Sequence, residues 1–266
     1  MSEYSPVITS KRHFLEQWTA TWYEEGFDGT FYQADYSAIP NHPFDSIYGI
    51  DLAYAGHSEG NFATPLFIKA TSAEGSANIH SVYELLDQVT IPLRYPRLVG
   101  ETTVDVSRIK GNPDMNIYMM YEYVEGLTPL SRLPLIAQDD VQYMLNTVYD
   151  IVDNLLYLGI AQLDDPILEN YGIDSDGNIW LFDFDTIGEL PDISDREESI
   201  IYAYHTIAIL RGAVRNISPH SAYQLIHSFL YERIPDKADE IWAQIQNIDN
   251  EEYLETLDRL GFLYAG

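Results

Sequence analysis

The sequence of 266 residues contains no cysteine. This absence excludes disulfide bonds and thiolate metal sites, and it removes any argument for a secreted, cross-linked scaffold. No run approaches the roughly 18 apolar residues that span a bilayer, and residues 1–20 lack the basic and then apolar layout of a signal peptide. We therefore expect a cytoplasmic protein with no membrane partner.

Basic residues are scarce: 14 Lys and Arg stand against 42 Asp and Glu, for a formal net charge of −28. Such a surface repels phosphate backbones, so we expect no nucleic-acid partner. Three explanations of the acidity stay open: a halophilic protein adapted to very salty cytoplasm, an acidic DNA-mimic inhibitor protein, and an ordinary acidic surface. The acids are scattered over the whole chain, which favours a solvated surface over a shaped decoy.

Apolar residues make up 46% of the chain, enough for a substantial core. Residues 11–26 carry apolar side chains at helical spacing and end at Gly26, which predicts an N-terminal helix. Residues 44–70 mix aromatic and β-branched residues with glycines, and PLFIKA at 65–70 is typical of a buried strand. A helix over 76–88 and strands around 97–100 and 117–123 follow.

The second half of the chain has helical periodicity. Apolar residues from 141 to 156 recur at i, i+3, i+4 and i+7, and Gly159 is a good left-handed helix stop. Two short apolar runs flank Asp174-Ser-Asp-Gly177, which predicts a hairpin. We expect helices through most of 198–266, around 200–210, 221–231, 237–246 and 251–260.

These patterns predict an α+β protein with a β-rich first half and a helical second half. We expect a helical extension over 1–43, a β-rich lobe with one helix over 44–123, and a mainly helical lobe over 124–266. The predicted hinge lies near residues 123–128.

The run LGIAQLDDPILENYGIDSDGNIWLFDFDTIG, residues 158–188, carries the chemistry. A long helix ends, a loop with carboxylates follows, and a hairpin returns another carboxylate to the same place. Four residues separate Asp165 from Asn170, and Asp183 lies six residues after the turn glycine, Gly177. This spacing resembles the catalytic loop and metal-binding triplet of protein kinases, H-R-D-x-x-x-x-N and D-F-G.

The resemblance to the protein-kinase-like superfamily implies a two-lobed fold that binds ATP with Mg²⁺ or Mn²⁺. By this resemblance, Asn170 and Asp183 hold the metal, and Asp165 is the catalytic base that deprotonates a hydroxyl acceptor. An amide oxygen and a carboxylate are ligands that suit Mg²⁺. The hairpin and loop over 160–188 thus form the predicted catalytic and metal-binding segment.

The resemblance also implies a lysine on a buried strand and an acidic partner about fifteen positions later on a helix. Lys69 in LFIKA and Glu84 in SVYELL meet both expectations. Lys69 is then expected to hold the α- and β-phosphates, with Glu84 fixing its position. The strand at 117–123 runs into a linker, where backbone groups near Tyr121 and Tyr123 are expected to bind adenine.

Several departures favour the atypical and small-molecule kinases of the superfamily. No G-x-G-x-x-G precedes Lys69; the segment Gly49–Gly60 is the nearest candidate, with a loop tip at Gly56–Gly60. Leu163 and Asp164 replace the histidine and arginine before Asp165. Asp185 replaces the glycine of the metal triplet, where it could bind a second metal or disturb the first.

No A-P-E signature follows Asp185, and only about a dozen residues separate it from the next predicted helix. The alternative is a pseudokinase that acts as a nucleotide-binding or scaffolding module. The acceptor, whether protein or small molecule, is not defined by the sequence.

Asp174-Ser-Asp-Gly also resembles the start of a calcium loop, but the glutamate expected at loop position twelve is missing, so we predict a turn.

Overall fold

A computed structural model describes residues 21–23, 27–33, 51–57, 60–103, 117–162, 167–184, 187–190 and 192–247. The chain divides into two compact units. The first, called the sheet unit, comprises Met1–Ser81 and Tyr95–Glu125. The second, called the helical unit, comprises Val82–Arg94 and Gly126–Gly266.

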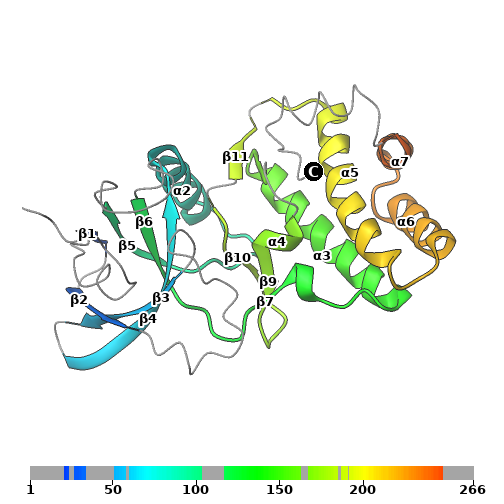
Figure 1. Cartoon of the computed structure of the whole chain (residues 1–266). Helices are drawn as coiled ribbons and strands as arrows, with labels where there is room; N and C mark the ends of the chain where they lie inside the picture. The colour runs from blue at the N-terminus through cyan, green and yellow to red at the C-terminus, as the bar shows by residue number, and fades with distance from the viewer. Residues whose placement is uncertain are drawn as a thin grey trace, which may run out of the picture. The chain divides into compact units, whose positions relative to one another are not determined.

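The sheet unit is built on an antiparallel sheet whose strands lie in the order β1-β5-β6-β4-β3-β2 (Figure 1). The long strand β4 pairs with β3 on one side and β6 on the other. Leu66 and Ile68 on β4 and Met119 and Met120 on β6 are buried and belong to the core of the unit. The strands are β1 (Thr21–Trp22), β2 (Phe27–Gln33), β3 (Asp51–His57), β4 (Gly60–Thr71), β5 (Leu98–Thr103) and β6 (Ile117–Glu122).

The predicted N-terminal helix over 11–26 is wrong at its C-terminal end. Thr21 pairs with Glu101 and Trp22 with Gly100, so this stretch is an edge strand of the sheet. β2 also falls within the segment 1–43 that was expected to be a helical extension. Backbone pairing with β5 outweighs the helical spacing of the aromatic residues, and aromatic and β-branched residues such as Thr21 and Trp22 suit a strand. Residues 1–20 lie outside the described part of the chain.

Helix α2 (Ala73–Asp87) follows β4 directly and contains most of the helix predicted at 76–88. Its buried face carries Ile79, Val82 and Leu86, at the spacing of one helical stripe. The division between the two units falls within this helix, between Ser81 and Val82. Residues Val82–Asp87 of α2 and the segment up to Arg94 therefore belong to the helical unit.

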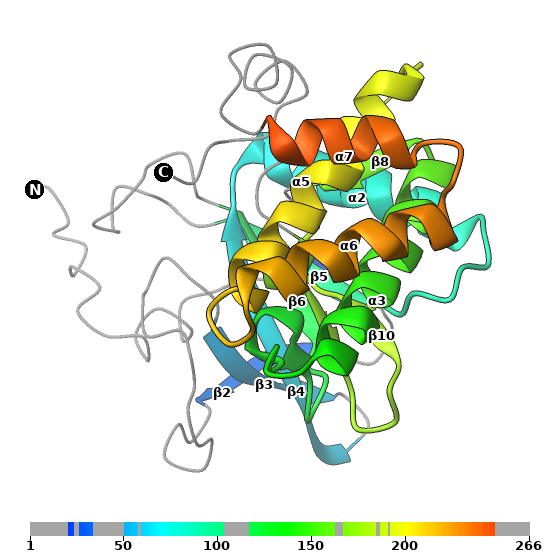
Figure 2. The same ribbon diagram turned by 90° about the vertical axis from the view of Figure 1, so that its right-hand side faces the viewer.

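Among its described residues, the helical unit contains four longer helices: α3 (Gln138–Tyr157), α5 (Asp195–Ala213), α6 (Pro219–Arg233) and α7 (Ala238–Gln246). Figure 2 shows α6 and α7 packed beside α3 and α5. The apolar face of α3 is buried, as its periodicity predicted: Val141, Met144, Leu145, Val148, Ile151, Val152 and Leu155. The predicted helical stretch at 251–260 lies outside the described residues.

Scarce basic side chains link these helices. Arg233 on α6 contacts two carboxylates of α3, at 2.8 Å from Asp150 and 2.6 Å from Asp153. Lys237, just before α7, pairs with Glu198 on α5. In a chain with a net charge of −28, these pairs place cations where helices approach each other.

Short strands join the helices of this unit. Strand β8 (Ile160–Gln162) pairs with β11 (Ile187–Glu189), and β9 (Tyr171–Ile173) pairs with both β10 (Ile179–Leu181) and β7 (Thr128–Pro129). The turn helices η3 (Leu130–Arg132) and α4 (Ile167–Asn170) complete the unit. The fold is therefore α+β, with a β-rich first unit and a mainly helical second unit, as predicted. None of the described helices is long and apolar enough to cross a membrane.

Gly159 ends α3 in the left-handed conformation, with φ of 71°. We predict that Gly159→Ala lowers the free energy of unfolding by about 1–2 kcal/mol, because a Cβ is strained at this φ. Urea unfolding measures this loss of stability. Gly159→Asn is the control and should lose less than Gly159→Ala, since asparagine tolerates the left-handed region better. Equal stability of the alanine variant and the wild type would contradict the assignment.

Candidate functional site

The hairpin of β9 and β10 brings Asn170 and Asp183 to the same end of the helical unit. Its register pairs Ile173 with Ile179 and Tyr171 with Leu181. The next position continues the ladder, because the backbone N–H of Phe182 donates to the carbonyl of Asn170 at 3.1 Å. Asn170 and Asp183 therefore flank the open end of the hairpin, on adjacent chain segments.

The turn at the other end of the hairpin confirms the turn predicted at Asp174–Gly177. Gly177 has φ of 82°, and its N–H donates to the carbonyl of Asp174 at 3.1 Å. Oδ1 of Asp174 accepts hydrogen bonds from the N–H groups of Asp176 and Asn178, each at 2.9 Å. Oδ1 of Asp174 thus stabilises the turn through these two hydrogen bonds.

Asn170 is the last residue of α4, and its side chain is buried. The first residue of α4, Ile167, donates its N–H to Nδ1 of His205 on α5 at 3.3 Å. His205 is also buried, and burial lowers the pKa of its imidazole from the ordinary 6.5 to about 3. A neutral imidazole accepts this hydrogen bond, so α5 holds the start of α4 only while His205 is uncharged.

Phe184, the middle residue of the predicted metal triplet, is buried against the second half of α2. Its ring lies 4.6 Å from that of Tyr83, centroid to centroid, at an interplanar angle of 36°. Glu84 follows Tyr83 and is exposed on the same helix. The residues that flank Asp183 on either side, Phe182 and Phe184, are thus each held by contacts within the helical unit.

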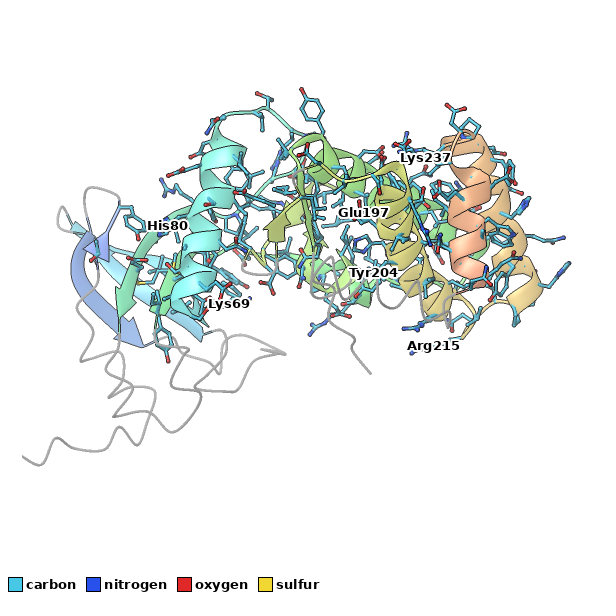
Figure 3. All side chains as sticks on the ribbon, turned by 90° about the horizontal axis from the view of Figure 1, so that it is seen from above. Lys69, His80, Glu197, Tyr204, Arg215 and Lys237 are labelled. Atoms are coloured by element: carbon cyan, nitrogen blue, oxygen red, sulfur yellow. The ribbon has the colours of Figure 1, made fainter. Side chains whose placement is uncertain are left out.

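The sheet unit carries the other predicted residues. Lys69 lies on β4, paired with Met119 of β6, and its side chain is half-buried (Figure 3). Tyr121 is buried at the end of β6, where its ring lies 6.3 Å from that of Phe67. Tyr123 is half-buried and lies between β6 and the boundary of the units.

Two predicted residues, Asp165 and Asp185, lie outside the described residues, as do Leu163 and Asp164. The loop tip predicted at Gly56–Gly60 corresponds to the hairpin between β3 and β4, where His57 pairs with Gly60.

The structure brings Asn170 and Asp183 together in the helical unit, with Glu84 on α2 of the same unit. Lys69, Tyr121 and Tyr123 belong to the sheet unit. Among the residues that the structure describes, no group of three or more His, Asp or Glu side chains is arranged to hold a metal ion.

The order of elements is the order that the resemblance to protein kinases predicts. A strand with a lysine precedes a helix with a glutamate. Two strands, a linker, a long helix and the hairpin between Asn170 and Asp183 follow.

Comparisons with known proteins find only distant similarity. No protein-family model matches the sequence, and no curated protein matches it either. Among solved structures, the Mycobacterium tuberculosis PknI kinase domain is 14% identical with a TM-score of 0.43, over 81% of this chain and 92% of that one. The chain is also similar, at 12% identity and a TM-score of 0.39, to a divergent Toxoplasma kinase that lacks the glycine-rich loop, over 74% of this chain and 75% of that one. These values are too low to carry residue roles over to this chain.

Sequence reasoning missed several residues that support the site. His205 stands in the apolar run of α5, where a buried histidine cannot be told from an exposed one. Arg94, which bridges to Trp180 of β10 from outside the hairpin, has no sequence spacing that indicates this contact.

His205 gives a testable dependence of stability on pH. Between pH 6.5 and about 3 the unfolded chain binds a proton at this imidazole that the folded protein excludes. Stability should therefore fall as the pH is lowered through this window, by up to about 1.4 kcal/mol per pH unit from this group.

Urea unfolding of His205→Gln, which keeps a neutral acceptor, should show a shallower slope across the same window than the wild type. The matched control is His220→Gln, at an exposed position on α6. An identical slope in wild type and His205→Gln would show that the buried imidazole is not the group responsible.

Proposed function

We propose that this chain is an atypical kinase that transfers the γ-phosphate of ATP to a hydroxyl acceptor. The observation that carries the proposal is the open end of hairpin β9–β10. There the hydrogen bond from Phe182 to Asn170 keeps an amide and a carboxylate on adjacent segments. Phosphoryl transfer is catalysed chiefly by positioning and charge stabilisation, so such a constellation suits it.

The donor set of Asn170 and Asp183 fits Mg²⁺. Both offer hard oxygen ligands, and Mg²⁺ in nucleotide sites is bound by one or two such protein groups together with phosphate oxygens. When bound, the metal neutralises charge on the phosphates. Mn²⁺ takes the same oxygen ligands. Asp185 is a further candidate ligand.

The remaining residues take the roles that the chemistry requires. Lys69 supplies an ammonium for the α- and β-phosphates, with Glu84 as its carboxylate partner. Asp165 accepts the proton of the acceptor hydroxyl as the oxygen bonds to the γ-phosphorus and the bond to ADP breaks. Backbone groups at Tyr121 and Tyr123 hold the adenine.

Turnover of ATP tests the proposal. We expect Mg²⁺- or Mn²⁺-dependent turnover or self-phosphorylation, measured at low and at molar salt because of the acidic composition. Asp183→Ala should reduce the rate of ATP turnover by about 100-fold or more, since the substitution removes a charge-stabilising group. Asp176→Ala at the exposed tip of the same hairpin is the control and should keep wild-type activity.

A thermal-shift measurement separates the enzyme from the pseudokinase alternative. Mg-ATP at 100 times its dissociation constant should stabilise the folded protein by about 2.7 kcal/mol. A shift without turnover at either salt concentration would favour a nucleotide-binding module. No shift and no turnover would refute nucleotide binding altogether.

A further inference from the structure

The carboxylate of Asp174 does more than close the hairpin turn. Oδ1 accepts the turn N–H groups, as described above, whereas Oδ2 accepts a hydrogen bond from Nε1 of Trp180 at 2.8 Å. The side-chain amide of Asn178 reaches both oxygens, at 3.0 and 2.9 Å. The hydrogen bond from Trp180, before those from Asn178 and Asp176, holds the pKa of Asp174 well below its usual range, so the group is charged at neutral pH.

Trp180 is in turn covered by Arg94 from a different part of the chain. The guanidinium carbon of Arg94 lies 5.9 Å from the centroid of the Trp180 ring. Nη1 of Arg94 also lies 3.7 Å from Oδ2 of Asp174. The Arg94 side chain is half exposed, so this ion pair contributes little by itself.

The backbone of Arg94 makes the stronger attachment. Its N–H donates to the carbonyl of Ile179 at 2.9 Å, and its carbonyl accepts from the N–H of Leu181 at 2.8 Å. Arg94 thus forms a parallel bridge beside Trp180, on the side of β10 opposite to β9. We call Asp174, Trp180 and Arg94 the hairpin clamp.

The clamp attaches the hairpin to the segment that follows α2. Residues 82–94, from the second half of α2 to Arg94, belong to the same unit as the hairpin. At the other end of the hairpin, Tyr83 packs against Phe184. The segment therefore contacts the hairpin at two points, the clamp near the turn and the ring pair next to Asp183.

We propose that Asp174 is a positioning residue: through Trp180 and Arg94 its carboxylate fixes the metal-binding end of hairpin β9–β10 relative to the second half of α2. The inference rests on the proposed function, because it concerns the same metal-binding residues, Asn170 and Asp183. The hydrogen bond from Trp180 to Oδ2 is not needed to close the turn, since Gly177 and the hydrogen bonds to Oδ1 already close it. The Oδ2 contact instead ties the turn to Trp180.

Trp180→Phe tests the clamp while it leaves the turn intact, because phenylalanine keeps an aromatic ring and lacks the N–H donor. The measurement is Mn²⁺ binding, by electron paramagnetic resonance, to the 266-residue protein saturated with a non-hydrolysable ATP analogue. We expect Trp180→Phe and Asp174→Asn to weaken Mn²⁺ binding by about 10-fold. This is the usual loss of metal affinity when a residue that orients a metal ligand, without touching the metal, is mutated. Trp242→Phe on α7 and Asp176→Asn at the turn are the matched controls and should bind as the wild type does.

Hydrogen exchange on the same variants shows that they are folded and reports the attachment directly. The amide of Leu181 should exchange faster in Trp180→Phe, whereas amides of α3 should keep wild-type rates. A role confined to global stability would raise exchange throughout and leave the Mn²⁺ affinity of the folded protein unchanged, which would overturn the inference.

The outcomes separate the two proposals. If the wild type binds Mn²⁺ with the ATP analogue and Trp180→Phe binds it equally well, the clamp inference is overturned and the proposed function stands. If the wild type binds no Mn²⁺ with the analogue, both fall.

Discussion

The candidate site depends on the register of one short hairpin. With Tyr171 opposite Leu181, the ladder ends at the bond between Phe182 and Asn170, and Asp183 comes next. A slip of one residue would turn every side chain of β10 to the opposite face and would separate the amide from the carboxylate. The left-handed glycine at 177, the Asp174 turn and the bridge to Arg94 all oppose such a slip.

The sequence predicts those elements whose cause is local. Helix α3 has an apolar period and a glycine stop, and the hairpin has turn residues with an obligatory conformation, so both were recognised. Strand β1 was not, because Thr21 and Trp22 become a strand only through pairing with β5, a contact between distant segments. Spacing alone cannot distinguish an edge strand from the end of an amphipathic helix.

The same distinction applies to the site. Asn170 and Asp183 are proposed as ligands because the chemistry of phosphoryl transfer requires their residue types, and the hairpin fixes their separation. His205 and Arg94 were missed because each acts through a backbone contact made from a distant segment. Neither the imidazole of His205, which accepts the N–H of Ile167, nor the backbone of Arg94, which pairs with β10, belongs to a periodic sequence pattern.

The central claim is that the open end of the hairpin binds a divalent metal together with nucleotide. The most direct measurement is a crystal structure of the protein with a non-hydrolysable ATP analogue and Mg²⁺. We predict metal–oxygen distances of about 2.0–2.1 Å to the side-chain oxygens of Asn170 and Asp183. A bound nucleotide whose metal contacts neither residue would contradict it.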